Sequence, residues 1–522
     1  MTAAADLIVT NAEVHTLTDP DTVHEAVAVR DGDIVRLGDA DELAFLEGVE
    51  TDVLDCEGRV VLPGFIDAHT HMEQLGQHLV HADLSSADSA ESCVDLLRRQ
   101  AEADPGREHV LGFGYDESSW DGSRTKPLTR EELDRVSEER PVVALRVDLH
   151  TVSLNTAALE AFADDLPDDD LRYADGEPTG VAVEDAAEAV RSALTAGREE
   201  MREVLTAAME RAVELGVTGV HDKVRGSRAP QVYRELAADD ALPLRVRIDY
   251  WSDHLESLVD VGLPTNAGSD RVRTGAIKSF SDGSFGSRTA RVREPYADAE
   301  TAEEASEDAR GQWVVDPDEL ASVTERASDE AFQICVHAIG DEAIEETLSL
   351  LEETPNAATA RHRIEHAELV TDDHLERMAE AGIVASMQPN FHRWADEGGL
   401  YDQRLGRERR NRTNRLRRVL EADVPLAFGS DCMPLDPLLG IQYAVNAGTE
   451  AQRLSVTEAL RAYTRGAAYA GFDEDRLGTL EVGKRADLVV LEASPWDHSE
   501  RIDEIDVATT VVDGEIVFDG HE

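Results

Sequence analysis

Eight short strand-like segments, separated by stretches with helical spacing, most constrain how this chain can fold. Strands that alternate with helices are typical of a parallel α/β architecture, because parallel strands need long crossover connections. Eight such strands can close a (β/α)8 or TIM barrel, whose active site lies at the carboxyl ends of the strands. The segments expected to form these strands are 61–68, 217–221, 244–250, 276–280, 331–336, 363–366, 383–388 and 426–430.

The interval between the first two predicted strands is too long for one barrel helix. Residues 83–200 contain further strand-like segments at 110–114 and 142–147, together with helix-patterned stretches. We therefore expect an inserted α/β subdomain at 83–200, between the start of the barrel at 61–82 and its remainder at 201–470. The alternative is that these two segments belong to the barrel and replace two of the eight.

The two ends of the chain resemble each other. Strand-like segments at 5–9 and 26–29 precede Asp31-Gly32-Asp33, and those at 486–491 and 509–512 precede Asp513-Gly514-Glu515. Asp-Gly is a frequent hairpin turn. Because neither end is long enough to bury a core alone, we expect residues 1–60 and 471–522 to form one small β-sandwich domain.

The charge balance of the chain is strongly acidic. It has 109 Asp and Glu against 50 Lys and Arg, a formal net charge of -59 over 522 residues. Nucleic-acid binding is excluded because it needs a basic surface. The acidic residues are spread along the chain, which favours a protein from a halophile. At 1 M salt the Debye length is about 3 Å, so repulsion between these acidic side chains is largely screened. The alternative is an acidic surface that attracts a basic partner.

Cysteine usage and hydropathy bear on the compartment. The four cysteines are scattered without paired spacing, which predicts reduced thiols. The N-terminus lacks the pattern of a signal peptide, and no stretch is as long and apolar as a membrane span. We therefore expect a cytoplasmic protein with no membrane association.

Side chains that bind metals occur at the ends of the predicted strands. His69 and His71 follow the first strand, where residues two apart point to the same side. Imidazole is a good ligand for zinc and similar ions. Because the carboxyl ends of barrel strands converge, we expect these histidines to meet partners from other strands. The further candidates, in chain order, are Lys278, His337, His366 and Asp431.

The motifs around these residues resemble the amidohydrolase superfamily of metal-dependent hydrolases. The resemblance covers nearly the whole chain and includes segments 63–71 and 478–488. Segments 112–117, 282–290, 337–341 and 429–431 resemble its amidohydrolase-3, YtcJ-like branch, which includes N-substituted formamide deformylases. The resemblance implies the TIM barrel fold and a hydrolytic activity.

The resemblance also implies a role for each candidate ligand. His69 and His71 would bind one metal ion, and His337 and His366 would bind a second. Asp431 would bind the first ion and, as the catalytic base, take a proton from the attacking water. The expected cofactor is one or two divalent metal ions, with zinc as the first candidate and iron, manganese or nickel also compatible.

Lys278 would bridge the two ions after carboxylation by CO2. The chain has only four lysines, Lys126, Lys223, Lys278 and Lys484. A protonated lysine would be repelled by metal ions, whereas its carbamate is an anionic oxygen ligand. Retention of a lysine here fits a need that arginine cannot meet. The alternative is an unmodified lysine that hydrogen-bonds a substrate beside a single metal ion held by the histidines.

Three residues are candidates for substrate contacts: His150, Arg288 and Trp120. The alternatives are an ion pair for Arg288 and core packing for Trp120. We predict hydrolysis of an amide-type C–N bond in a small molecule, such as an N-substituted formamide or N-acyl amine. Deaminase, cyclic-amide or ester hydrolase activity on the same scaffold is an alternative, as is a non-catalytic regulatory protein. The resemblance also allows a homodimer.

Overall fold

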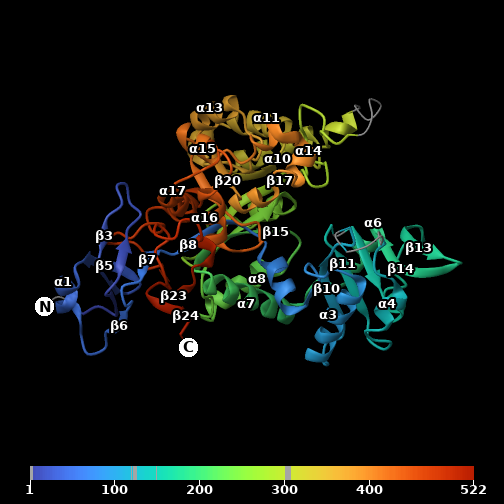
Figure 1. Cartoon of the computed structure of the whole chain (residues 1–522), viewed down its shortest axis with the longest axis horizontal. Helices are drawn as coiled ribbons and strands as arrows, with labels where there is room; N and C mark the ends of the chain where they lie inside the picture. Colours follow the sequence, from blue (N-terminus) through green and yellow to red (C-terminus); the bar gives the residue numbers. More distant parts are fainter. Residues whose placement is uncertain (1–3, 119, 121–125, 149, 300–306, 522) are drawn as a thin grey trace. The chain divides into compact units, whose positions relative to one another are not determined.

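The computed structural model describes residues 4–118, 120, 126–148, 150–299 and 307–521. The backbone divides into two compact units, which are described separately. Unit 1 comprises Met1–His71, Met209–Gly226 and Tyr233–Glu522, and unit 2 comprises Met72–Ala208 and Ser227–Val232. Figure 1 colours the elements along the chain from the blue N-terminus to the red C-terminus.

Unit 1 is built around an eight-stranded parallel sheet in the order β8-β15-β16-β17-β18-β19-β20-β21. The two edge strands approach each other, and the backbone N–H that follows β21 at Asp431 donates to the carbonyl of His69 at 2.8 Å. The sheet is thus curved almost into a closed barrel, which confirms the predicted fold class. The strands are β8 (Phe65–Thr70), β15 (Val217–Val224), β16 (Arg245–Trp251), β17 (Val272–Phe280), β18 (Ile334–Ala338), β19 (Arg363–His366), β20 (Val384–Met387) and β21 (Leu426–Phe428).

Helices follow the barrel strands and pack on their outer side. α10 (Pro317–Asp329) contacts β17 and β18, α11 (Asp341–Glu352) contacts β18 and β19, and α13 (Asp372–Ala381) packs on α11 (Figure 1). Local sequence sets their ends, because Asp316 and Thr371 cap the N-termini of α10 and α13 with their side chains.

Unit 1 contains further helices. They are α1 (Ala40–Leu43), α9 (Leu255–Asp260), α12 (Ala357–Ala360), α14 (Leu400–Arg410), α15 (Leu416–Glu421), α16 (Pro437–Val445), α17 (Val456–Arg461) and α18 (Ala467–Ala470). Single 3-10 or π turns occur at η1 (Ala44–Leu46), η3 (Ser252–His254), η4 (Glu307–Arg310), η5 (Pro389–Trp394), η6 (Ala462–Gly466) and η7 (Ile502–Glu504). The unit boundary falls within α7 (Arg198–Glu214) and α8 (Ala229–Ala238).

The single first strand predicted at 61–68 is wrong. The chain forms two strands there, β7 (Val60–Pro63) and β8, which belong to different sheets. Gly64 separates them and packs so closely on β15 that an added Cβ would lie 2.2 Å from a Thr218 methyl carbon. Pro63 also lacks the N–H that a continuous ladder needs. Only β8 carries the histidines into the barrel.

Both chain ends contribute to a second layer of unit 1. A six-stranded sheet of order β24-β23-β22-β7-β2-β3 combines the two termini, and a four-stranded sheet of order β5-β4-β1-β6 is N-terminal only. Apolar residues of both sheets share one core, as expected for a β-sandwich. The strands are β1 (Leu7–Thr10), β2 (Glu13–His15), β3 (Val23–His24), β4 (Ala26–Arg30), β5 (Asp33–Gly38), β6 (Asp52–Asp55), β22 (Leu488–Leu491), β23 (Val507–Val512) and β24 (Glu515–Asp519).

Unit 2 has its own six-stranded mixed sheet of order β13-β14-β12-β11-β10-β9. The segments at 110–114 and 142–147 lie in β10 and β11, which pair with each other, so the alternative that placed them in the barrel is wrong. The strands are β9 (Ala82–Asp83), β10 (Val110–Tyr115), β11 (Val142–Arg146), β12 (Thr151–Leu154), β13 (Leu171–Ala174) and β14 (Glu177–Val183). The helices are α2 (Met72–Val80), α3 (Ala90–Ala103), α4 (Arg130–Asp134), α5 (Thr156–Ala161) and α6 (Glu184–Ala193), with a turn at η2 (Asp168–Asp170). Across the described ranges, every helix is too short or too polar to cross a bilayer.

Candidate metal centre

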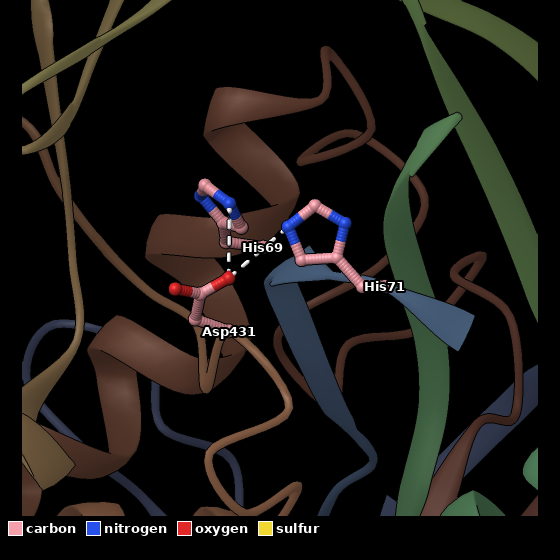
Figure 2. Close-up of side chains that lie close together, drawn as sticks. All are labelled: His69, His71 and Asp431. Atoms are coloured by element: carbon pink, nitrogen blue, oxygen red, sulfur yellow. Dashed lines mark ion pairs between the residues drawn. The ribbon is translucent and has the colours of Figure 1, made fainter. Parts of the chain in front are cut away.

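His69, His71 and Asp431 converge at the carboxyl ends of the edge strands β8 and β21. Oδ1 of Asp431 lies 3.4 Å from Nε2 of His69 and 3.2 Å from Nε2 of His71 (Figure 2). Ligand atoms from all three residues lie within 4.8 Å of one another, the one such group found among the described residues. The His69 side chain is buried, whereas that of His71 is 27% exposed, so the group is open on one side.

The backbone holds Asp431 against the histidines. Asp431 and Cys432 both adopt the left-handed region, at φ 57° and 54°, which turns the chain sharply after β21. Such a conformation is costly for residues other than glycine and is characteristic of functional sites. The Sγ of Cys432 accepts a hydrogen bond from the His71 backbone N–H at 3.2 Å. Burial raises the pKa of the Cys432 thiol well above its usual value, which opposes a role as a nucleophile.

Glu365 fixes the orientation of the His69 ring. The Nδ1–H of His69 donates to Oε2 of Glu365 at 2.6 Å, and both side chains are buried. Burial lowers the pKa of His69 well below its usual value, so the ring is neutral. A neutral ring with its proton on Nδ1 leaves a lone pair on Nε2, the atom that faces Asp431. Carboxylates that support metal-bound histidines in this way are common in metalloproteins.

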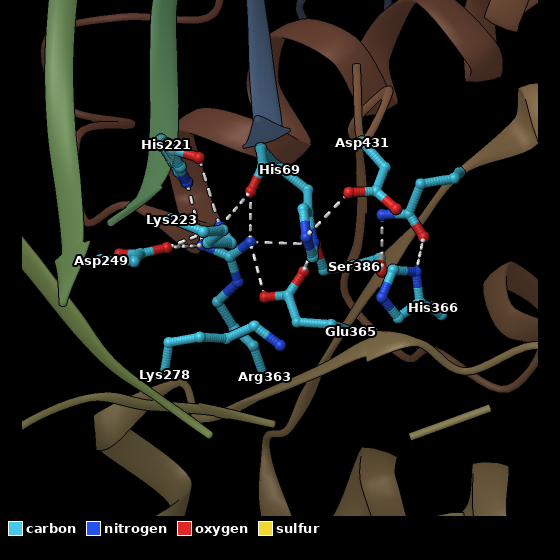
Figure 3. A network of polar contacts seen from close by, with 12 residues as sticks. His69, His221, Lys223, Asp249, Lys278, Arg363, Glu365, His366, Ser386 and Asp431 are labelled. Carbon is cyan, nitrogen blue, oxygen red and sulfur yellow. Dashed lines mark hydrogen bonds and ion pairs between the residues drawn. The ribbon is translucent and has the colours of Figure 1, made fainter. Parts of the chain in front are cut away.

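Charged side chains from neighbouring strands continue this contact through the barrel interior. Glu365 pairs with Arg363 at 2.8 Å, and Arg363 lies 3.5 Å from Asp249. Asp249 pairs in turn with Lys223 at 2.6 Å (Figure 3). All four side chains are fully buried. We call this chain of alternating charges the barrel ion network; loss of one member would leave its partner as an uncompensated buried charge.

His366 and His337 lie next to the converging group. The ring centroids of His69 and His366 are 4.9 Å apart, and those of His366 and His337 are 4.4 Å apart. The Nδ1–H of His366 donates to Oε1 of Gln388 at 2.6 Å, which leaves its Nε2 free to bind an ion. The Nε2–H of His337 donates to the carbonyl of Gly283 at 3.0 Å, so its lone pair is on Nδ1.

Lys278 is completely buried between aromatic rings. Its ammonium lies 4.0 Å from the ring centroid of Phe280 and 5.7 Å from that of Trp251, and it donates to the carbonyl of Ser279 at 3.1 Å. Burial lowers its pKa to about 8. A lysine in such a site is partly neutral at physiological pH, so its nitrogen can act as a nucleophile.

The donor set fits a divalent metal ion. The neutral imidazole of His69 presents an Nε2 lone pair, Nε2 of His71 lies beside the same carboxylate, and Asp431 supplies an anionic oxygen. Burial works to raise the pKa of Asp431, but interactions with His69 and His71 outweigh it and hold the carboxyl ionised. Imidazole and carboxylate ligands suit zinc and also iron, manganese and nickel.

The three residues predicted to contact the substrate lie in different surroundings. Arg288 belongs to unit 1 and pairs with Asp298 at 2.7 Å, with its side chain 47% exposed. Trp120 belongs to unit 2 and is buried in its core beside Tyr115. His150 also belongs to unit 2 and is 71% exposed, with Nδ1 3.3 Å from Glu184. The contacts of Arg288 and Trp120 match the alternatives of ion pairing and core packing.

Sequence reasoning missed the barrel ion network. Arg363 and Glu365 lie on a predicted strand, and charged residues two apart inside a strand predict side chains on one face. Asp249 and Lys223 also lie on predicted strands or directly after them. A charged residue inside a predicted strand that must be buried is the sequence signal for an ion network of this kind.

Comparison with known proteins places this site in a family. Residues 52–518 match the model of the Amidohydrolase family. The chain is 30% identical to a putative amidohydrolase, YtcJ, from Bacillus subtilis, over 97% of this chain and 98% of that protein. It is 27% identical to an N-substituted formamide deformylase from Arthrobacter pascens, over 99% of both chains.

A solved structure agrees with these sequence matches. An uncharacterized metal-dependent hydrolase from Pyrococcus furiosus has a TM-score of 0.80 and 30% identity, over 94% of this chain and 99% of that one. The family match, the relatives and the converging histidines all point the same way. The chain therefore belongs to the amidohydrolase family of metal-dependent hydrolases.

Proposed function

We propose that this protein hydrolyses an amide-type C–N bond in a small molecule, with an N-substituted formamide or another N-acyl amine as the substrate class. The observation that carries the proposal is the convergence of His69, His71 and Asp431 at the open end of the barrel. The likeness to an N-substituted formamide deformylase over 99% of the chain supports the choice of bond.

Each residue of the site has a part in this reaction. His69 and His71 would hold a divalent ion through Nε2, and Glu365 would keep the His69 ring in the required tautomer. The ion would supply an activated water at neutral pH and polarise the substrate carbonyl. Asp431 would take the proton of the water and deliver it to the leaving amine.

We further propose that Lys278 is carboxylated and that His337 and His366 hold a second ion with it. The neutral Nζ would attack the carbon of CO2 and lose a proton, which yields an anionic carbamate. The buried position and lowered pKa of Lys278 support this step. NMR of protein equilibrated with ¹³CO2 would test it: a carbamate resonance that is absent from Lys278→Arg supports the proposal, and identical spectra contradict it.

Two other functions use the same residues. A deaminase or a hydrolase of cyclic amides or esters would need the same ion and the same base, because the fold does not choose among them. A regulatory protein without catalysis would have no need for a supported histidine and an ionised Asp431 at one point. The catalytic alternatives differ from the proposed reaction in their products, and a regulatory protein would form no product.

The test is a substrate screen with the metal-loaded protein. N-formyl and N-acyl amines are incubated with it, and formate or carboxylate, free amine and ammonia are measured separately. Release of carboxylate plus amine supports the proposal, and ammonia alone supports a deaminase. Asp431→Asn should keep the fold but lower kcat at least 100-fold, because a general base contributes about 10²–10⁴. Near-normal kcat in this variant would contradict the role of Asp431.

A further inference from the structure

A small cavity lies at the amino ends of the barrel strands, the opposite ends from His69. It has a free volume of about 20 Å³, which is room for one or two water-sized particles. Its wall includes residues at the start of β16 and β17 and on the segment after α18. Five of the lining residues are arginines: Arg245, Arg247, Arg271, Arg273 and Arg476. This concentration of guanidinium groups is conspicuous in a chain with a net charge of -59.

Carboxylates neutralise all but one of these arginines. Asp270, Asp473, Asp487 and Asp513 are the acidic partners, so five positive charges face four negative ones. Arg485 pairs with Asp270 of this group and also with Asp33. Including Arg485 and Asp33 adds one positive and one negative charge, so the excess of one positive charge remains. The excess positive charge predicts that the cluster binds an anion.

Arg247 is the arginine that lacks a close carboxylate. Its side chain is only 4% exposed, and Nη1 lies 3.8 Å from Asp473, too far for a hydrogen bond. Nη2 donates to Asn266, whereas Nε and Nη1 have no hydrogen-bond partner among the described residues. Arg271 likewise has a buried Nη1 without such a partner. Unsatisfied N–H groups of a buried cation are costly, so the cavity is built to receive an acceptor.

The nearest other acid on the strand of Arg247 is already used. Asp249 lies two residues further along β16 and pairs with Lys223 and Arg363 of the barrel ion network. Burial lowers the pKa of Arg247 to about 10, but the guanidinium remains a cation at neutral pH. Arg271 and Arg476 are 22% and 24% exposed, so ions can reach the cavity past them.

We propose that this cavity binds a small monovalent inorganic anion of the size of chloride, held by Nε and Nη1 of Arg247 and by Nη1 of Arg271. The single excess positive charge sets the charge of the ligand. The free volume of about 20 Å³ suits a halide-sized ion. The site lies outside the metal centre and does not depend on the proposed reaction.

Thermal unfolding in different anions tests the proposal. The full-length protein is kept at constant sodium concentration and ionic strength while gluconate, which is too large for the cavity, is replaced by chloride. Above the dissociation constant, each tenfold rise in chloride should raise Tm by about 1 °C in a chain of this length, because a ligand of the folded state stabilises it logarithmically. A Tm that is independent of the anion would overturn the proposal.

Two variants separate anion binding from simple structural loss. Arg247→Gln should abolish the dependence of Tm on chloride, whereas Arg412→Gln, which removes the same charge from a side chain that is 63% exposed, should retain it. If Arg247 only stabilised the fold, Arg247→Gln would lower Tm equally in both anions and leave the chloride dependence unchanged, which would contradict the proposal.

Crystals of the unaltered protein grown in bromide give a test that needs no variant. Anomalous density in hydrogen-bonding contact with Arg247 would support the site even if Arg247→Gln failed to fold. Water or no density in this cavity at molar bromide would overturn it.

Discussion

Glu365→Gln tests whether the barrel ion network controls the metal centre. Both carboxylate oxygens of Glu365 face donors, since Oε2 accepts from Nδ1 of His69 at 2.6 Å and Oε1 lies 2.8 Å from Arg363. An amide has one oxygen and one NH2 group, so it can satisfy only one of these donors. If the NH2 group faces His69, the ring must change tautomer and Nε2 then carries the proton that blocks metal binding.

The size of the effect follows from this geometry. Loss of a residue that supports a metal ligand costs about 10–100-fold in metal affinity, or about 1.4–2.7 kcal/mol. If the NH2 group faces Arg363 instead, two buried donors oppose each other, which costs about 1–3 kcal/mol of folding stability. Either orientation is therefore measurable: weaker zinc binding indicates that the amide NH2 faces His69, and a larger loss of stability indicates that it faces Arg363.

Competition with a chelator gives the zinc dissociation constant of each protein, and chemical unfolding of the metal-free protein gives the stability. The matched control is Glu376→Gln, the same change at an exposed position on α13. We expect the control to bind zinc as the unaltered protein does. Zinc affinity and stability in Glu365→Gln within twofold and 0.5 kcal/mol of the control would refute the reasoning, since surface substitutions stay within about this range.

Three further outcomes are expected. Lys278→Arg should lower metal content and kcat even if the arginine cation is accommodated, because arginine cannot form the carbamate. Elemental analysis and rates measured with added CO2 check this. Full activity of the variant would exclude a carboxylated Lys278 that bridges two metal ions. Burial lowers the pKa of His362 and His392 to about 4, so the unfolded state binds more protons than the folded state below about pH 6.5. The free energy of unfolding should therefore fall as the pH is lowered from 6.5 towards 4. His392→Gln should make this fall less steep, and an unchanged pH dependence in that variant would contradict the assignment to His392. The net charge of -59 predicts that unfolding free energy rises from dilute buffer to 2 M potassium chloride, and full stability in dilute buffer would contradict a salt-adapted protein.

Much of the barrel could be predicted from the sequence, because short strand-like segments alternate along the chain with stretches of helical spacing. The exception was the first strand. Gly64 and Pro63 divide it between two sheets, and the close approach of Gly64 to Thr218 depends on tertiary packing that local pattern does not contain. The length of the interval at 83–200 and the strand-like segments within it are the signals that predict an insertion.

The candidate site was predictable to a smaller extent. His69 and His71 share a side of one strand end, and Asp431 meets them because β21 is the spatial neighbour of β8 in a nearly closed barrel. The distances of His337 and His366 from this group depend on backbone details such as the left-handed φ of 70° at His366. The residues of the barrel ion network are separated widely in sequence, so their pairing required the three-dimensional register.

The most direct test of the central claim is a crystal structure with anomalous data collected at the absorption edge of the bound metal. The account predicts a metal peak bound by Nε2 of His69, Nε2 of His71 and a carboxylate oxygen of Asp431, in protein whose hydrolase activity is lost with a chelator. Protein that hydrolyses amides at the full rate without metal, or a metal bound elsewhere, would contradict it.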